Sequence, residues 1–330
     1  MGIKMLELNF YNVGDGDSAL LSLKNPGKRD YNVLIDAGRD VLDCSEKSKR
    51  SLSISHLLND HVDHIDVVII THLHIDHMGG FLDILKAVPI SRIIVPYIPK
   101  GKIAAFPKLT PEDPKAHKWP EFCRVLSLWS ESLELAKKKG CLIENAWDLP
   151  IIEKDGLKIE QILSPNNFQK QRDFYDSLFG TNGEAKDNSS RILNPDWRDV
   201  SNSKNPDSTM QLITYSGKQI LMCGDRYADS FEDWQGGECE LVKIPHHGDP
   251  KSMTPKLLAA LNPKLAIISC QINPRKDKDR PNEKIIEMLK ANGISVFCTE
   301  NKALPSLAES SHRKICIRLN EDGEFSQLVY

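Results

Sequence analysis

The chain has 330 residues, of which 40% are hydrophobic and 27% are charged, and this composition fits a folded soluble protein with a large core. Its net charge of −3 excludes an overall positive field for nucleic acid, so any such binding needs a local basic patch. Its eight cysteines are scattered singly, the N-terminus has no hydrophobic signal core, and no apolar run is long enough to span a membrane. We therefore expect a cytoplasmic protein with reduced thiols, outside the membrane.

Hydrophobic periodicity and turn residues predict the secondary structure in chain order. Strands are expected at residues 5–13, 19–24, 31–38, 66–72, 91–99, 209–217, 218–225, 239–248, 265–271 and 294–300, with a β-hairpin at 314–330. Helices are expected at residues 51–61, 77–88, 119–139, 254–261 and 282–291.

One set of strands is followed by a second set, each with helices between its strands, which suggests two sheets packed face to face with helices outside. Residues 164–206 are polar with a few aromatic side chains, and we interpret them as a long insertion and not as a separate domain. The expected organisation is therefore a single domain over residues 1–330 that carries this insertion.

Three histidines and an aspartate fall within six residues in "THLHIDHMGG", residues 71–80. His72, His74, Asp76 and His77 lie where an expected buried strand ends and a helix begins, so the intervening loop can direct them at one centre. Imidazole nitrogens and carboxylate oxygens suit zinc or another first-row divalent ion. The segment is thus a candidate half of a metal site.

Two other expected strands end in residues of the same kind. "ILMCGD" ends at Asp225, and "LVKIP" leads into His246 and His247. An aspartate after a strand is by itself often a turn residue. Beside the histidine cluster it is a candidate ligand, and its two oxygens could bridge two ions.

These motifs resemble the metallo-β-lactamase fold superfamily, and "THLHIDHMGG" matches its H-x-H-x-D-H signature. Within the superfamily the chain looks most like the hydrolase domain of the DNA-uptake protein ComEC. That subgroup has "VGQGD", "IDAG", an N-x-x-S stretch leading to "GD", and "HHGS". The corresponding stretches here are "NVGDGDSALL", "LIDAG", "NPDSTMQLITYSGKQILMCGD" and "KIPHHGD".

The resemblance implies a four-layer αββα sandwich, with two mixed sheets flanked by helices, and a site for two divalent ions, Zn²⁺ or Mn²⁺. By this resemblance His72 and His74 hold one ion, Asp76 and His77 hold the second, and Asp225 bridges them. A histidine of the 246–247 pair completes the second site. Because neighbouring strand residues point to opposite faces, one histidine should bind metal and the other should face the substrate. The sequence leaves open which is which, so Asp76, His246 and His247 are all candidate catalytic residues.

The chain also departs from the subgroup pattern. Asp15 replaces the glutamine of "GQGD", Asp249 replaces the serine of "HHGS", and "RPNE" at 280–283 stands where the subgroup has a histidine-proline loop. Asp15, Asp17 and Asp36 lie in glycine-containing turns. They are either turn residues or hydrogen-bond acceptors that orient the metal histidines.

Candidate substrate-binding residues come from two stretches. Asn205 and Ser208 form the N-x-x-S stretch. Arg275, Lys276, Lys278 and Arg280 follow an expected strand, and either form a solvated loop or neutralise substrate phosphates.

The resemblance implies a hydrolase in which a water molecule bridging two metal ions attacks the substrate. The expected bond is a phosphodiester in nucleic acid or a nucleotide. A hydrolase of a lactone, thioester or lactam is a second interpretation, and a metal-stabilised sensor or interaction module without catalysis is a third. The sequence does not indicate a protein partner.

Overall fold

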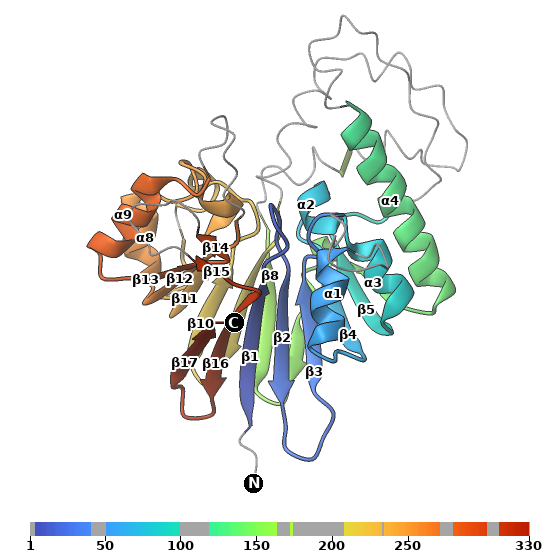
Figure 1. Ribbon diagram of the computed structural model, residues 1–330, viewed down its shortest axis with the longest axis horizontal. Coiled ribbons are helices and arrows are strands. Elements are labelled where there is room, and N and C mark those ends of the chain that lie inside the picture. Colours follow the sequence, from blue (N-terminus) through green and yellow to red (C-terminus); the bar gives the residue numbers. More distant parts are fainter. Residues whose placement is uncertain are drawn as a thin grey trace, which may run out of the picture.

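Two β-sheets lie face to face at the centre of the molecule, with helices on their outer sides, in the computed structural model (Figure 1). The structure describes residues 4–40, 51–99, 119–163, 172–173, 208–232, 234–270, 280–301 and 310–329. Most of the insertion expected at 164–206 lies outside these residues. Within the described residues, no helix has both the length and the apolar character that crossing a bilayer requires.

The first sheet combines the N-terminal strands with the C-terminal hairpin. Its order is β17 (Phe325–Val329), β16 (Lys314–Asn320), β1 (Met5–Tyr11), β2 (Ala19–Lys24), β3 (Tyr31–Ile35), β4 (Ile65–Ile69), β5 (Ile90–Val95) and β6 (Leu142–Asn145). The strands from β17 to β3 pair antiparallel, and those from β3 to β6 pair parallel. The sheet is therefore mixed.

The second sheet is mixed in the same way. Its order is β13 (Ser295–Cys298), β12 (Leu265–Ile268), β11 (Leu241–Lys243), β10 (Lys218–Met222), β9 (Met210–Tyr215), β8 (Leu157–Ile162) and β7 (Ile152–Lys154). Strands β10 to β13 pair parallel, whereas β7 to β10 pair antiparallel. The strands β14 (Glu300–Asn301) and β15 (Ser310–Ser311) form a separate two-stranded sheet.

Helices complete the four layers. The first sheet is covered by α1 (Leu52–Asn59), α2 (Ile75–Met78), α3 (Phe81–Ala87) and α4 (Trp119–Lys138). The second sheet is covered by α8 (Pro255–Leu261) and α9 (Glu283–Ala291). Short 3-10 turns lie at η1 (Ala146–Asp148), η3 (Ala228–Ser230) and η4 (Pro245–Gly248). The αββα arrangement predicted from the sequence is confirmed.

The end of β4 shows why residues 67–70 are an unbroken apolar run. Val67 and Ile69 pack between the two sheets, and Val68 packs against the helices. A strand buried on both faces has no need for alternating polar residues. The run therefore ends only where β4 meets the polar cluster that begins at Thr71.

Candidate metal centre

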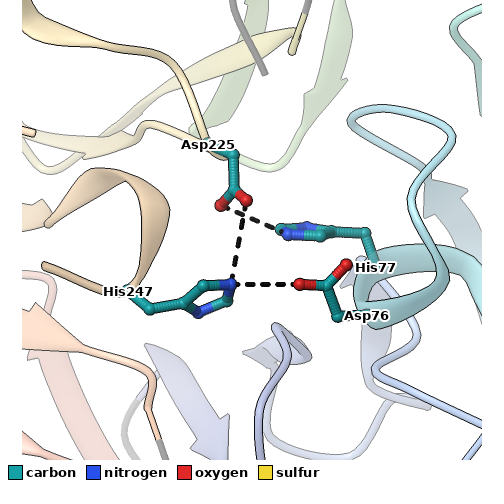
Figure 2. Close-up of side chains that lie close together, drawn as sticks. All are labelled: Asp76, His77, Asp225 and His247. Atoms are coloured by element: carbon teal, nitrogen blue, oxygen red, sulfur yellow. Dashed lines mark ion pairs between the residues drawn. The ribbon is translucent and has the colours of Figure 1, made fainter. Parts of the chain in front are cut away.

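The predicted ligands come from strand ends that meet at one end of the two sheets. In the first sheet, β4 leads into His72, His74 and α2, which carries Asp76 and His77. In the second, β10 leads into Asp225, and β11 leads into the turn η4 with His247. Residues that lie far apart in the chain thus converge between the sheets (Figure 2).

The turn η4 has an unusual backbone that places its two histidines. His246 has φ 50° and His247 has φ 55°, both in the left-handed region. Non-glycine residues pay roughly 1–2 kcal/mol to adopt this conformation. Strain of this kind is typical of functional sites, where the surrounding structure holds it in place.

Four side chains form the first group of candidate ligands. One donor atom from each of Asp76, His77, Asp225 and His247 lies within 4.8 Å of the others. His77 Nε2 is 3.2 Å from Asp225 Oδ1, and His247 Nε2 is 3.4 Å from Asp76 Oδ2 and 3.7 Å from Asp225 Oδ2 (Figure 2). The set offers two imidazoles and two carboxylates, which suits Zn²⁺ or Mn²⁺.

A second group consists of His72, His74 and Asp225. His72 Nε2 lies 2.9 Å from His74 Nδ1 and 4.0 Å from Asp225 Oδ2. Asp225 belongs to both groups, as a bridging carboxylate must. With three candidate ligands, this second group leaves more of an ion's coordination sphere open than the first.

The hydrogen bonds of the outer imidazole nitrogens fit metal binding. His247 Nδ1 is 2.9 Å from the carbonyl oxygen of Ser269, which can only accept, so Nδ1 carries the proton and the lone pair is on Nε2. His77 Nδ1 is 2.7 Å from Asp36 Oδ2 and is oriented in the same way. In the described part of the structure, His77 Nε2, His247 Nε2 and Asp225 Oδ1 are buried without a hydrogen-bond partner. These nitrogen and oxygen atoms face one another at distances that suit either a proton on the imidazole or a metal ion between them.

Asp36 supports both groups. Its Oδ2 accepts the Thr71 hydroxyl at 2.8 Å as well as His77, and its Oδ1 accepts the Thr71 amide at 2.8 Å. Because Thr71 donates its hydroxyl proton to Asp36, its oxygen is free to accept from His72 Nδ1 at 3.1 Å. One buried carboxylate therefore orients His77 directly and His72 through Thr71.

In the metal-free centre, the surrounding charges favour protonated histidines at the positions where metal ions would bind. Burial would lower the pKa of His77, but Asp225 and Asp36 outweigh it and raise that pKa well above its ordinary value. Burial also opposes charge on His247, yet Asp225 and Asp76 raise its pKa to about 9. Conversely, His77 and His247 overcome the effect of burial on Asp225 and hold its pKa well below the ordinary value. The site is therefore built to hold positive charge.

A metallo-β-lactamase superfamily sequence model matches residues 14–131, which include Asp17, Asp36 and the whole 72–77 cluster. Together with the two mixed sheets and their flanking helices, this match decides the fold. The chain has the metallo-β-lactamase fold.

The ComE operon protein 3 of Bacillus subtilis (strain 168) is a relative of this metallo-β-lactamase-fold chain, with 24% identity over 307 residues. The match covers 89% of the chain but 32% of that protein, so the chain spans about a third of its relative's length.

Two solved structures are also similar. The metallo-beta-lactamase fold protein YhfI from Bacillus subtilis aligns at 11% identity with a TM-score of 0.46, over 92% of this chain and 98% of YhfI. A diphosphatase from the PhnP family aligns at 14% identity with a TM-score of 0.41, over 95% of this chain and 86% of that protein.

The structure separates the two histidines that the sequence left undecided. His247 belongs to a ligand group, whereas His246 is in none of the groups found among the described residues. His246 Nε2 is 3.8 Å from Asp225 Oδ2, and its Nδ1 is 3.5 Å from Asp249 Oδ2. His246 therefore lies beside the centre, and His247 is the candidate ligand.

Other predicted residues have different positions. Ser208 is fully buried, and its hydroxyl accepts from the Asp225 amide at 3.2 Å, so it supports Asp225. Asp15 pairs with Arg39 at 3.6 Å. Arg280 pairs with Asp249. Asn205, Arg275, Lys276 and Lys278 lie outside the described residues.

Sequence reasoning missed Lys243, which is 2% exposed. Its ammonium group bonds Asp17 Oδ2 and lies 3.3 Å from the Gly224 carbonyl. Asp17 in turn lies between two ligands, with its oxygens 3.6 Å from His247 Nδ1 and 3.8 Å from His77 Nδ1. The one signal was a lysine inside the apolar run "ELVKIP", where a buried cation needs a partner.

Proposed function

We propose that this chain is a hydrolase with two divalent metal ions that cleaves phosphodiester bonds in nucleic acid or nucleotides. The observation that carries the proposal is the sharing of Asp225 by two groups of candidate ligands at the junction of the two sheets. Proteins of the metallo-β-lactamase superfamily are mostly metal-dependent hydrolases, and the match over residues 14–131 includes four of the candidate ligands.

In the proposed enzyme, His72 and His74 would hold one ion, Asp76, His77 and His247 would hold the other, and Asp225 would be shared by both. Zn²⁺ and Mn²⁺ both suit these ligands. When bound, the ion pair supplies a water molecule acidic enough to attack at neutral pH and positive charge for the developing oxyanion.

The protein's own residues orient and enclose this chemistry. Asp36, Thr71 and the Ser269 carbonyl fix the imidazole rings, so that the ligand nitrogens need no reorganisation when substrate arrives. The group with three ligands is the more open one, and we assign the substrate's phosphate to that side. His246 lies beside the shared carboxylate, with its Nε2 3.8 Å from Asp225 Oδ2.

Two observations support a phosphodiester as the bond cleaved. The similarity to ComE operon protein 3 extends over 89% of the chain, and the resemblance to the hydrolase domain of the DNA-uptake protein ComEC rests on the "HHG" and N-x-x-S motifs. In addition, Arg280 places a cation near His246, where an anionic substrate would be neutralised.

A hydrolysis panel tests the proposal. Single- and double-stranded DNA, RNA, cyclic nucleotides, a phosphodiester chromogen, a lactone, a thioester and a lactam would be incubated with protein loaded with Zn²⁺ or Mn²⁺. We expect turnover of at least one phosphodiester, its loss after chelation, and its return when metal is added back.

The other interpretations predict different results. Turnover of the lactone, thioester or lactam without any phosphodiesterase activity would assign the centre to carboxylic-acid derivatives. Full metal content without turnover of any substrate would favour a sensor or interaction module. The His72→Ala and Asp76→Ala variants serve as controls, because each removes a ligand from a different group.

A further inference from the structure

Two departures from the ComEC-like sequence pattern lie in contact. Asp249 replaces the serine of "HHGS", and Arg280 stands at the histidine-proline loop. In the fold, Arg280 Nε and an Nη of the same guanidinium lie 3.0 and 2.9 Å from Asp249 Oδ2. The two residues that depart from the pattern thus form one ion pair next to the metal centre.

This pair is held firmly by the turn η4. Asp249 Oδ1 accepts from the Lys251 amide at 2.9 Å, while its Oδ2 lies 3.5 Å from His246 Nδ1. The Asn282 amide donates to the Gly248 carbonyl at 2.8 Å. Both oxygens of Asp249 are therefore engaged, and the segment that begins with Arg280 is fastened to the turn.

A single side chain, that of His246, lies between the Asp249–Arg280 pair and the Asp225 carboxylate. His246 contacts Asp249 through Nδ1 and approaches Asp225 Oδ2 through Nε2, at 3.8 Å. The Arg280 side chain is 26% exposed and keeps guanidinium donors that Asp249 does not use. Lys251 is exposed and lies 6.0 Å above the Tyr227 ring, whose edge packs on His246. Arg280 and Lys251 thus contribute two positive charges beside the centre, against the single negative charge of Asp249, whose oxygens both already accept hydrogen bonds.

We propose that Arg280, oriented by Asp249, binds a second phosphate group of the substrate, next to the phosphodiester that lies at the metal centre. This inference rests on the proposed function and narrows its substrate class. The preferred substrate is then a nucleotide chain or another molecule with adjacent phosphates, and not an isolated phosphodiester. A guanidinium in fixed orientation suits this role because it offers paired donors to phosphate oxygens.

Substrates that differ by one phosphate provide the first test. The kcat/KM of a thymidine dinucleotide carrying a terminal 5′- or 3′-phosphate would be compared with that of the same dinucleotide without it. We expect the wild type to prefer one phosphorylated form by about tenfold or more, the scale of one charge-assisted hydrogen bond. Arg280→Gln and Asp249→Asn should reduce this ratio to about one, with metal content equal to the wild type.

Arg318→Gln is the matched control. Arg318 also pairs with one carboxylate through Nε, at 2.8 Å from Glu7, but it belongs to β16 and lies opposite Glu7 of β1 in the first sheet. It should keep the wild-type ratio. A preference that survives in Arg280→Gln, or is absent from the wild type, would overturn the inference.

A binding measurement separates this inference from the proposed function. Thymidine 3′,5′-bisphosphate and thymidine 5′-phosphate would be titrated into metal-loaded protein by calorimetry. The wild type should bind the bisphosphate about tenfold more tightly, and Arg280→Gln should lose the difference. If no dinucleotide is cleaved but this difference is found and then lost in the variant, the proposed reaction fails and the phosphate site stands. Equal affinity of the wild type for both nucleotides would rule out the proposed phosphate site.

Discussion

At the residue scale, Asp36 is a hydrogen-bond acceptor that orients the metal histidines, which is one of the two interpretations that the sequence left open. It contacts His77 directly and reaches His72 only through Thr71. Asp36→Asn should therefore weaken both metal sites, because an amide cannot accept hydrogen bonds at both of its ends. Thr71→Val should weaken the His72 site alone. Loss of an orienting hydrogen bond typically costs 10- to 100-fold in metal affinity.

Titration of chelated protein with Mn²⁺, followed by electron paramagnetic resonance, measures the two affinities. Two weakened sites in Asp36→Asn and one in Thr71→Val are expected. Identical isotherms for the two variants would show that Thr71 does not relay the effect of Asp36.

The protonation of His247 gives the metal-free protein a characteristic pH dependence. The pKa of His247 is about 9 in the folded chain, compared with an ordinary value of 6.5. Its contribution to stability is therefore fully present below pH 6.5 and is lost as pH rises through 9. We expect the Tm of chelated protein to fall over this interval, and the fall to be smaller in His247→Gln. Differential scanning calorimetry at several pH values checks this, and a Tm that rises from pH 6.5 to 9 would contradict it.

At the element scale, the pair of Lys243 and Asp17 joins β11 to the loop between β1 and β2, and so joins the two sheets. Lys243→Met leaves Asp17 buried without its cation, which typically costs about 3–5 kcal/mol. Lys314→Met is the control, because Lys314 pairs with Asp60 at 2.7 Å but both side chains are 11% exposed. Urea unfolding of the chelated variants should show that Lys243→Met loses clearly more free energy of unfolding than Lys314→Met. Equal losses in the free energy of unfolding would mean that the pair of Lys243 and Asp17 contributes no more to stability than the pair of Lys314 and Asp60.

At the scale of the whole molecule, the metal centre bridges two halves of the fold. His72, His74, Asp76 and His77 follow a strand of the first sheet, whereas Asp225 and His247 follow strands of the second. Bound metal should therefore stabilise the complete sandwich, by about 2.7 kcal/mol for an ion present at 100 times its dissociation constant. We expect a higher Tm with metal and a lower one after chelation.

Asp225→Asn tests the same point. The substitution keeps the shape of the side chain but removes the charge shared by both ligand groups. We expect fewer than two ions per chain, most of the metal-induced rise in Tm to be lost, and activity to fall by about two orders of magnitude or more. Circular dichroism should show an unchanged fold, and Asp66→Asn, at the Arg29 pair, serves as the control. Normal activity and metal content in Asp225→Asn would mean that the bridging ligand lies elsewhere.

Features set by neighbours in the chain were predictable from the sequence alone. The cluster from His72 to His77 is contained in one strand end, so its spacing is enough to indicate a metal site. The apolar run of β4 and the amphipathic pattern of α4 identify buried elements for the same local reason. The short strands β6 and β7 were not predicted, because three or four residues give little periodic signal. The strand β8 was also missed, although its alternating pattern "LKIEQI" is typical of a half-buried strand.

Contacts between distant parts of the chain required the tertiary structure. Which histidine of η4 joins the ligands depends on two left-handed residues, whereas the sequence argument assumed an extended strand. Asp249 meets Arg280 across 31 positions, and Lys243 meets Asp17 across 226. Spacing in the sequence carries no information about such pairs. Asp249 and Arg280 meet when the segments after β11 and before α9 pack within one half of the fold, and Lys243 meets Asp17 only when the two sheets pack together.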